Sequence, residues 1–365
     1  MSHDLARYHR QMLLPGFGAA GQRKLLESTA LIMGCGALGS VAADLLARAG
    51  VGHLKIIDRD FVELTNLQRQ VLFDEQDVAD GIPKAEAARR KIARSNSQVT
   101  VTPIVDDLNH ANIDRFAADA DILIDGLDNF ETRYLANDCA VKNGIPYMYG
   151  GAVSTVGMAY AILPHTPSGN AWWETAAGGS RATPCFRCLF EEAPPPGESP
   201  TCDTVGVLGP VVSMIASFQA AEALKILTGN LAQVCPTLLS IDLASNRITQ
   251  LGVGGVWEDG DCHCCKLHDF EYLDGKAGSS ATSLCGHDAV QLRHRQTVAG
   301  IDLEEIAARL ARHGDVRSNE FMVRAQLTEN GKAYEITLFT DGRAIVKGTG
   351  EEAVARGVYS KYIGN

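Results

Sequence analysis

The stretch Ala30-Leu31-Ile32-Met33-Gly34-Cys35-Gly36-Ala37-Leu38-Gly39 decides the fold class of this chain. Its four apolar residues, typical of a buried strand, run into a glycine-rich turn. Residues 40–50 follow as an alanine-rich segment with helical spacing, and residues 51–58 form a second apolar strand pattern. A strand, a glycine loop, a helix and a second strand in this order predict the opening unit of a doubly wound sheet.

The alternation of strand and helix patterns continues to about residue 152. Helices are predicted at 84–95 and 129–143, and strands at 99–105, 121–125 and 146–152. This order predicts an α/β fold, Rossmann-like, with a mostly parallel sheet.

Beyond residue 162 the regular alternation of strands and helices ends. A segment rich in Pro, Gly, Ser and Thr is followed by a long apolar helix at 209–228 and a hairpin near 238–251. A main domain is therefore expected over residues 1–266, a linker over 267–283, and a small α+β domain over 284–365.

The composition predicts a soluble globular protein. Of the 365 residues, 45% are hydrophobic and 21% are charged, proportions typical of folded domains. The net charge of −11 disfavours nucleic acid and anionic membranes as partners. The first eleven residues are polar and charged and contain no secretory signal, so the expected location is the cytoplasm.

Gly34, Gly36 and Gly39 predict a phosphate-binding loop. Without side chains they let the backbone approach phosphate oxygens, and the helix that follows offers N–H groups and a partial positive charge. This pattern alone suits a dinucleotide as well as ATP. Asp58 ends the second predicted strand, where an acidic side chain commonly accepts hydrogen bonds from ribose hydroxyls. The alternative for Asp58 is a structural cap of a turn.

Asn66, Arg69 and Lys84 favour ATP over a dinucleotide as the ligand of this loop. An amide and two cations near the loop are suited to holding the β- and γ-phosphates of ATP and to stabilising departing pyrophosphate. A nicotinamide-dependent oxidoreductase has no need of them. Asp128 follows a buried strand at its carboxyl end, where a carboxylate is suited to Mg²⁺. Its alternative role is to cap the helix at 129–143.

The cysteines indicate a metal site. Cys185-x-x-Cys188 and Cys262-x-x-Cys265 together supply four thiolates, the ligand set of a closed structural zinc site. Cys264 competes with Cys265 for the fourth position. A redox role for the two pairs is the alternative, but neither pair opens a helix after a strand.

Cys202 lies in the Pro-rich region ahead of the long helix. A thiol there is placed to attack an activated acyl group and form a thioester, and an incidental free cysteine is the alternative. Cys285 follows the predicted linker, where a thiol is suited to relaying sulfur or acyl groups; a buried or incidental thiol is the favoured alternative.

Taken together and in order, these motifs resemble the MoeB/ThiF/HesA family, the bacterial relatives of ubiquitin-activating enzymes. The resemblance covers about Leu5 to Lys266. The matching segments are Arg7-Tyr8-His9-Arg10-Gln11, the glycine loop, Asn66-Leu67-Gln68-Arg69-Gln70, Pro83-Lys84, Asp128-Asn129, Pro184-Cys185-Phe186-Arg187-Cys188, Gly206-Val207-Leu208-Gly209-Pro210 and the final cysteine pair.

The resemblance implies a homodimer that uses ATP, Mg²⁺ and structural zinc to adenylate the C-terminal Gly-Gly carboxylate of a ubiquitin-like sulfur carrier of the MoaD/ThiS type. It implies that Arg10 reaches the partner subunit's ATP and that Asp58 holds the ribose. Phosphate contacts are implied for Asn66, Arg69 and Lys84, magnesium for Asp128, and a bond to the carrier for Cys202.

Two features depart from the family pattern. Extra residues, including Trp172 and Trp173, lie between Leu163 and Pro184, and the C-terminal segment lacks a recognisable rhodanese loop. Sulfur would then come from a separate donor, a cysteine desulfurase or sulfurtransferase, or pass through Cys285. The competing hypotheses are a nicotinamide-dependent oxidoreductase and a zinc-containing scaffold that binds ATP or a carrier without turnover.

Overall fold

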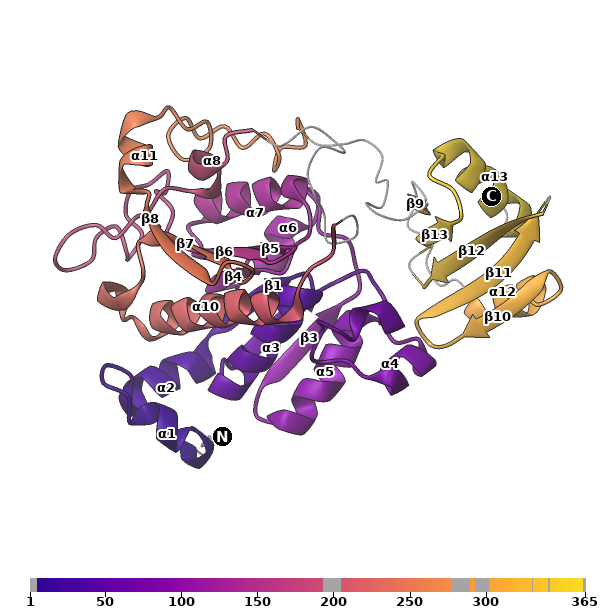
Figure 1. Cartoon of the computed structure of the whole chain (residues 1–365), viewed down its shortest axis with the longest axis horizontal. Helices are drawn as coiled ribbons and strands as arrows, with labels where there is room; N and C mark the ends of the chain where they lie inside the picture. Colours follow the sequence, from indigo (N-terminus) through magenta and orange to yellow (C-terminus); the bar gives the residue numbers. More distant parts are fainter. Residues whose placement is uncertain are drawn as a thin grey trace. The chain divides into compact units, whose positions relative to one another are not determined.

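The computed structural model describes residues 5–192, 205–277, 289–292, 302–329, 331–340 and 342–363. The chain divides into two compact units, Met1–Gly278 and Ser279–Asn365 (Figure 1). Each unit has its own sheet and its own apolar core. Part of the predicted linker at 267–283 lies outside the described residues.

The first unit is built on an eight-stranded sheet in the order β3-β2-β1-β4-β5-β6-β7-β8. Its strands are β1 (Thr29–Met33), β2 (His53–Ile57), β3 (Thr100–Ile104), β4 (Ile122–Asp125), β5 (Tyr147–Val153), β6 (Val156–Ile162), β7 (Thr237–Asp242) and β8 (Arg247–Gly252). Neighbours from β3 to β5 pair in parallel, and β6, β7 and β8 extend the sheet in antiparallel pairs. The predicted α/β fold with a mostly parallel, Rossmann-like sheet is confirmed.

Helices cover both faces of this sheet. They are α1 (His9–Met12), α2 (Gly18–Glu27), α3 (Ala37–Ala49), α4 (Glu75–Asp80), α5 (Lys84–Ser95), α6 (Ile113–Ala117), α7 (Phe130–Asn143), α8 (Phe186–Leu189), α10 (Gly209–Thr228) and α11 (Gly254–Asp259), with 3₁₀ turns η1 (Leu5–Tyr8), η2 (Leu64–Asn66) and η3 (Leu231–Gln233). Alternate residues of β1 enter different cores, because successive side chains of a strand point to opposite faces. Ile32 packs in the core under α3, α5 and α10, and Leu31 packs in the core under α6 and α7.

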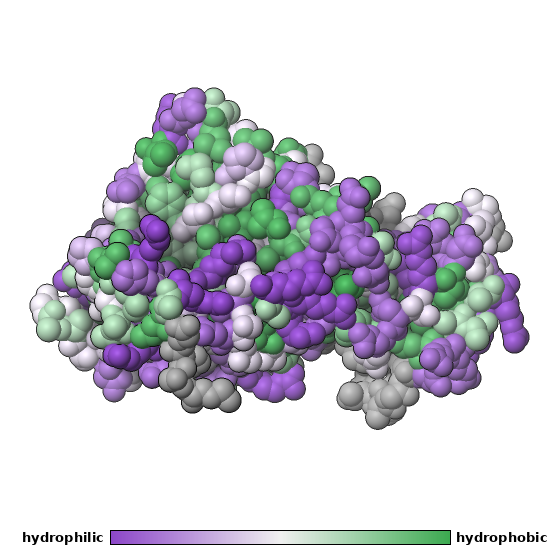
Figure 2. All heavy atoms as spheres, turned by 90° about the horizontal axis from the view of Figure 1, so that it is seen from below, coloured by the Kyte–Doolittle hydropathy of each residue, from purple (hydrophilic) through white to green (hydrophobic). Residues whose placement is uncertain are grey.

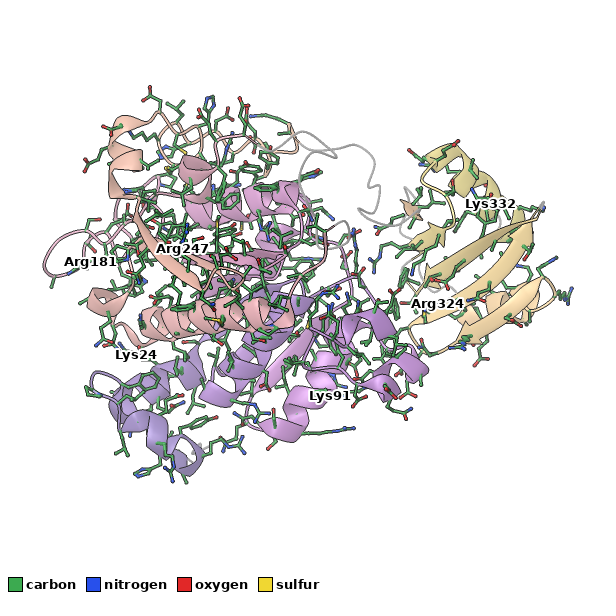
Figure 3. The ribbon with its side chains drawn as sticks, in the orientation of Figure 1. Lys24, Lys91, Arg181, Arg247, Arg324 and Lys332 are labelled. Atoms are coloured by element: carbon green, nitrogen blue, oxygen red, sulfur yellow. The ribbon has the colours of Figure 1, made fainter. Side chains whose placement is uncertain are left out.

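Helix α10 is long and apolar enough to cross a membrane, judged by length and composition only. In this fold it is a core helix, since it packs on α3 and on strands β5 and β6. Val212 and Ile215 on its inner face are buried. Lys24 of α2, labelled in Figure 3, donates from Nζ to the Thr228 carbonyl at 3.1 Å and so satisfies the C-terminal end of α10.

The second unit has a five-stranded antiparallel sheet in the order β10-β11-β12-β13-β9. Its elements are β9 (Ala289–Leu292), α12 (Leu303–Leu310), β10 (Gly314–Ser318), β11 (Met322–Glu329), β12 (Lys332–Phe339), β13 (Ala344–Lys347) and α13 (Glu352–Tyr362). Leu310, Ile336 and Val358 share one apolar core, so the predicted small α+β unit is confirmed as a fold. Figure 2 shows, on one face of the larger unit, a broad apolar area (green) bordered by polar and charged residues (purple).

Candidate functional site

The glycine loop joins β1 to α3 and is built by close backbone approach. Gly34 has φ +87°, and a Cβ atom there would lie 2.6 Å from the Gly126 carbonyl oxygen. A Cβ atom on Gly39 would lie 1.9 Å from the Gly34 carbonyl oxygen. Gly36 differs from both, because the nearest atom to a Cβ there would be the Gln70 amide nitrogen at 3.9 Å. Only Gly36 therefore leaves room for a ligand at the N-terminus of α3, while Gly34 and Gly39 permit the loop to fold.

Asp58 is tied to this loop. Its Oδ2 accepts from the Cys35 backbone N–H at 2.6 Å, and its Oδ1 accepts from the Asp60 backbone N–H at 2.7 Å. Burial raises the pKa of Asp58 to about 6, and the Lys84 ammonium group opposes that rise. The structural alternative, a turn cap, is thus realised. It is compatible with ribose binding, because each carboxylate oxygen has a further lone pair.

Lys84 is the first residue of α5 and is buried. Its Nζ lies 3.0 Å from Asp60 Oδ2. Burial alone would lower the pKa of Lys84, but the carboxylates of Asp60 and Asp58 outweigh it and raise the pKa above its ordinary value. A protonated ammonium group is therefore present beside the glycine loop, as an anion-binding site requires.

Asn66 is the last residue of η2, and Arg69 lies on the turn that follows it. Asn66 is buried, and its Oδ1 accepts from the Glu63 backbone N–H at 3.1 Å. Arg69 donates from Nη1 to the Thr65 carbonyl at 3.0 Å. This turn packs on the start of α10, since a Cβ on Gly209 would lie 3.1 Å from the Gln68 carbonyl oxygen.

Asp128 follows β4 and its side chain is exposed. The Asn129 amide donates to Asp128 Oδ1 at 3.0 Å, and Asn129 Oδ1 accepts from the Thr132 backbone N–H at 2.9 Å. Asn129 is therefore the cap of α7, and the capping alternative for Asp128 is wrong. The negative charge of Asp128 is one of the charges that raise the pKa of Arg59. Asp128 therefore lies near Arg59, at the same edge of the sheet.

A buried polar network that the sequence does not indicate lies under this edge. Asp125 is fully buried at the end of β4 and accepts from Arg133 Nε at 3.1 Å and from the Tyr147 hydroxyl at 2.8 Å. Arg133 Nη2 also donates to the carbonyls of Leu127 at 2.6 Å and Gly150 at 3.2 Å. The network fixes the backbone that carries Asp128. The spacing from Asp125 to Arg133, with no charge pattern between them, gives no signal of this contact.

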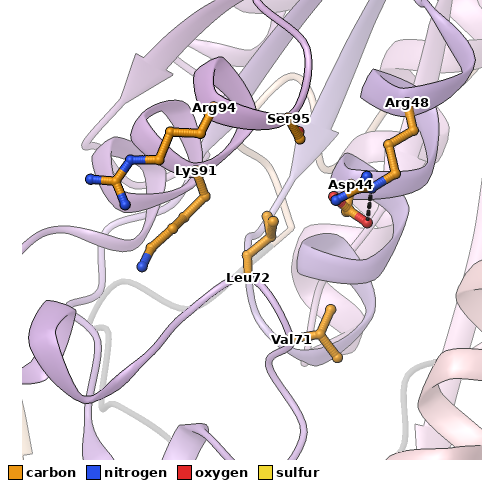
Figure 4. Close-up of a pocket in the computed structure, with 7 residues that line it drawn as sticks. All are labelled: Asp44, Arg48, Val71, Leu72, Lys91, Arg94 and Ser95. Carbon is orange, nitrogen blue, oxygen red and sulfur yellow. Dashed lines mark hydrogen bonds and ion pairs between the residues drawn. The ribbon is translucent and has the colours of Figure 1, made fainter. Parts of the chain in front are cut away.

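The other predicted site residues are placed differently. Arg10 is exposed on α1, which packs on α2 and η1, and among the described residues no contact links it to the glycine loop. Cys202 and Cys285 lie outside the described residues. A separate hollow lies between α3 and α5 (Figure 4). Two of its three basic side chains are in ion pairs, Arg48 with Asp44 and Lys91 with Asp74, and Arg94 also lines it.

The two cysteine pairs meet. The four sulfur atoms of Cys185, Cys188, Cys262 and Cys265 all lie within 4.8 Å of one another. The separations are 3.8 Å for Cys185–Cys188, 3.6 Å for Cys185–Cys262 and 3.5 Å for Cys188–Cys265. Four thiolates bound tetrahedrally to zinc stand about 3.8 Å apart, so the donor set fits that ion.

Cys264 does not belong to this group of four. Its sulfur accepts from the Asn137 amide at 3.2 Å, and the Asp138 carboxyl also interacts with it. The Asn137 side-chain oxygen Oδ1 in turn accepts from the Phe186 backbone N–H at 2.8 Å. Helix α7 thus holds the N-terminus of α8, and the first cysteine pair lies on α8 and its N-cap.

Comparison with known proteins identifies similar chains. The ThiF family model matches residues 8–256. The sulfur carrier protein ThiS adenylyltransferase of Bacillus subtilis is 41% identical over 359 residues, 98% of this chain and 99% of that protein. The SAMP-activating enzyme E1 of Haloferax volcanii is 39% identical over 224 residues, 61% of this chain and 76% of that protein. The crystal structure of Escherichia coli MccB with ATP has a TM-score of 0.54 and 26% identity, covering 68% of this chain and 71% of that one.

Proposed function

Because this chain belongs to the ThiF family, we propose that it is an adenylyltransferase that activates the C-terminal Gly-Gly carboxylate of a ubiquitin-like sulfur carrier. One observation carries the proposal: Gly36, Asp58 and Lys84 lie together at the carboxyl edge of the parallel strands. Sheets of this kind bind their ligands at that edge. Similarity over nearly the whole chain to a ThiS adenylyltransferase supports it.

The residues at this edge divide the work on ATP. Gly36 admits a phosphate to the N-terminus of α3, and Asp58 accepts from the ribose hydroxyls. Asn66, Arg69 and Lys84 bind the outer phosphates. Asp128 holds Mg²⁺, which neutralises phosphate charge when it is bound. Arg10, exposed and remote from its own loop, serves the ATP of the partner subunit in a homodimer.

The reaction forms one bond and breaks one. A carboxylate oxygen of the carrier bonds to the α-phosphorus of ATP, and the bond from that phosphorus to the bridging oxygen of the β-phosphate breaks. The electron pair leaves with pyrophosphate, whose charge the cations of Arg69 and Lys84 stabilise. Such transfers depend mainly on positioning and electrostatics, which is what the buried contacts of Lys84 provide.

The proposal is tested by ATP–pyrophosphate exchange with a panel of small ubiquitin-like carriers ending in Gly-Gly. Exchange that depends on one carrier supports adenylation and identifies the carrier. Absence of exchange with every carrier, in a chain that binds ATP and zinc, would favour the scaffold hypothesis instead. The nicotinamide alternative is supported by the glycine loop alone, and titration with NAD⁺ checks it directly.

We further propose that Cys185, Cys188, Cys262 and Cys265 hold one structural zinc ion. Replacing Cys188 by Ser should reduce bound zinc below one per chain and lower the unfolding temperature, because a weakened cage stabilises the fold less. Zinc is measured by elemental analysis of the purified chain. Cys264→Ser is the matched control, and it should keep full zinc content. Loss of zinc in the control with retention in Cys188→Ser would overturn the assignment.

Cys202 is proposed to act after adenylation. Its thiol would bond to the carrier's C-terminal carbonyl and release AMP, before a separate sulfur donor completes the transfer. We expect Cys202→Ala to keep carrier-dependent ATP–pyrophosphate exchange within about twofold of the natural chain, since exchange reports adenylate formation and the thioester step would follow it. Loss of exchange in this variant would show that Cys202 does not act downstream. The proposed location is the cytoplasm.

A further inference from the structure

Lys84 is attached to Asp60 at two points. The Lys84 backbone N–H donates to the Asp60 carbonyl at 2.8 Å, and the Lys84 ammonium group donates to Asp60 Oδ2 at 3.0 Å. The neighbouring residues Phe61 and Pro83 form a β-bridge that keeps the two segments together. The position of the lysine side chain is therefore set by one residue that is not itself on α5.

Asp60 is in turn fixed to the glycine loop. Its backbone N–H donates to Asp58 Oδ1 at 2.7 Å, while Asp58 Oδ2 accepts from the Cys35 N–H at 2.6 Å. Arg59 Nε lies 3.7 Å from Asp60 Oδ1 on the other side. A continuous chain of contacts thus runs from the glycine loop through Asp58 and Asp60 to the ammonium group of Lys84.

The two ends of the ion pair differ in exposure. The Lys84 side chain is 8% exposed, whereas the Asp60 side chain is 48% exposed. Burying an ammonium group without a partner costs folding free energy. A buried lysine that binds phosphate therefore needs an anion beside it while the nucleotide is absent. One N–H of the ammonium group satisfies Asp60, and two remain for phosphate oxygens.

We propose that Asp60 is a positioning residue for the nucleotide site, which holds the ammonium group of Lys84 charged and oriented beside the glycine loop before ATP binds. This role rests on the proposed function, since it presumes that ATP occupies the loop. Asp60 acts through Lys84 and makes no contact with the reacting atoms. A purely structural turn residue would instead affect the fold and leave the charge state of Lys84 unchanged.

Few other groups face Lys84. They are the Asp58 carboxylate and the Cys35 thiol. Glu86, on the same helix α5, forms ion pairs with Arg89 and Arg90 instead. In the natural chain the pKa of Lys84 is raised above 10.5, so the free protein keeps the cation through pH 10. Without the Asp60 charge, the effect of burial on Lys84 is opposed mainly by Asp58, and the pKa of Lys84 falls. Affinity for an anion then declines once the pH exceeds that lower pKa.

The test is the affinity of the full chain for MgATP, measured by calorimetry between pH 7.5 and 10. We expect the natural chain to be nearly independent of pH in this range. Asp60→Asn should lose affinity by about tenfold between pH 8 and 10, because each unit above the pKa of a required cation costs up to tenfold. Asp60→Glu should restore the flat profile. In Asp60→Asn/Lys84→Arg the decline should disappear, because a guanidinium group does not titrate.

Controls separate the possible failures. Asp119→Asn removes the partner of another lysine, Lys55, remote from the glycine loop, and should leave the profile flat. Circular dichroism at each pH confirms that every variant is folded. A flat profile for Asp60→Asn overturns the positioning role. Failure of the natural chain to bind MgATP at any pH would instead overturn the proposed function.

Discussion

Asp128→Ala should abolish carrier-dependent ATP–pyrophosphate exchange while the chain remains folded. The carboxylate is exposed, and within the described part of the chain it accepts a single hydrogen bond, from the neighbouring Asn129 amide, so its removal leaves no buried group unpaired. The cap of α7 is supplied by Asn129 and stays intact. Loss of the proposed magnesium ligand should reduce the exchange rate by about a hundred- to a thousandfold, the scale of a missing electrostatic contact at a reacting group.

Binding provides a second measurement for the same variant. The affinity of Asp128→Ala for ATP should depend less on added Mg²⁺ than that of the natural chain, because the ion no longer bridges protein and nucleotide. Asp44→Ala, which breaks an ion pair with Arg48 on α3, is the control and should exchange normally. Exchange by Asp128→Ala at the natural rate would remove Asp128 from the site.

Much of the fold was predictable because its strongest elements carry local signals. Helix α5 begins at Lys84 and ends at Ser95, as the Pro83 start signal and the alanine spacing predict. Helix α10 also has its predicted bounds, between the Pro near its start and Gly229 after its end. Strand β6 (Val156–Ile162) is not among the predicted strands, because one glycine and two alanines among its seven residues weaken its strand signal.

The candidate site was predictable in outline and not in its contacts. The order of motifs places Gly36, Asp58 and Lys84 at one sheet edge, because carboxyl ends of parallel strands meet there. What the order cannot show is which polar groups pair with each other. The Asp60–Lys84 pair joins residues 24 positions apart, and its geometry depends on the bridge between Phe61 and Pro83.

The cysteine site was also predictable in outline and not in its contacts. The two Cys-x-x-Cys pairs are visible in the sequence, and their distance in the chain says nothing against a shared ion. The choice between Cys264 and Cys265 needs the structure, because it depends on Asn137 of α7 occupying the sulfur of Cys264. Long-range polar contacts of this kind leave no periodicity in the sequence.

Arg133→Met should be the most destabilising of these substitutions, because it leaves a buried carboxylate without its cation. Asp125 is fully buried and Arg133 is 8% exposed, so water cannot replace the lost guanidinium group. The carbonyls of Leu127 and Gly150 lose a donor at the same time. Breaking one partner of a buried ion pair costs about 3–5 kcal/mol, and we expect a loss of that size in urea unfolding.

The loss should depend on pH in a definite direction. Burial raises the pKa of Asp125 in the natural fold, and Arg133 opposes the rise. In Arg133→Met that opposition is gone, so the folded pKa rises further above the unfolded value near 3.8. The folded state then binds the proton more tightly than the unfolded state, and stability falls as the pH rises through that interval. The gap between variant and natural chain should therefore be wider at pH 8 than at pH 5.

A double variant distinguishes the charge effect from simple loss of packing. Arg133→Met/Asp125→Asn removes both charges. The free energy of unfolding lost in this double variant should be smaller than the sum of the losses in the two single variants. Arg48→Met breaks an exposed pair and should change stability by no more than about 0.5 kcal/mol. Additive losses with no dependence on pH would mean that Arg133 stabilises the fold by packing alone. Because Arg133 holds the Leu127 carbonyl, the coupled result would also link this buried charge to the position of Asp128 at the nucleotide edge.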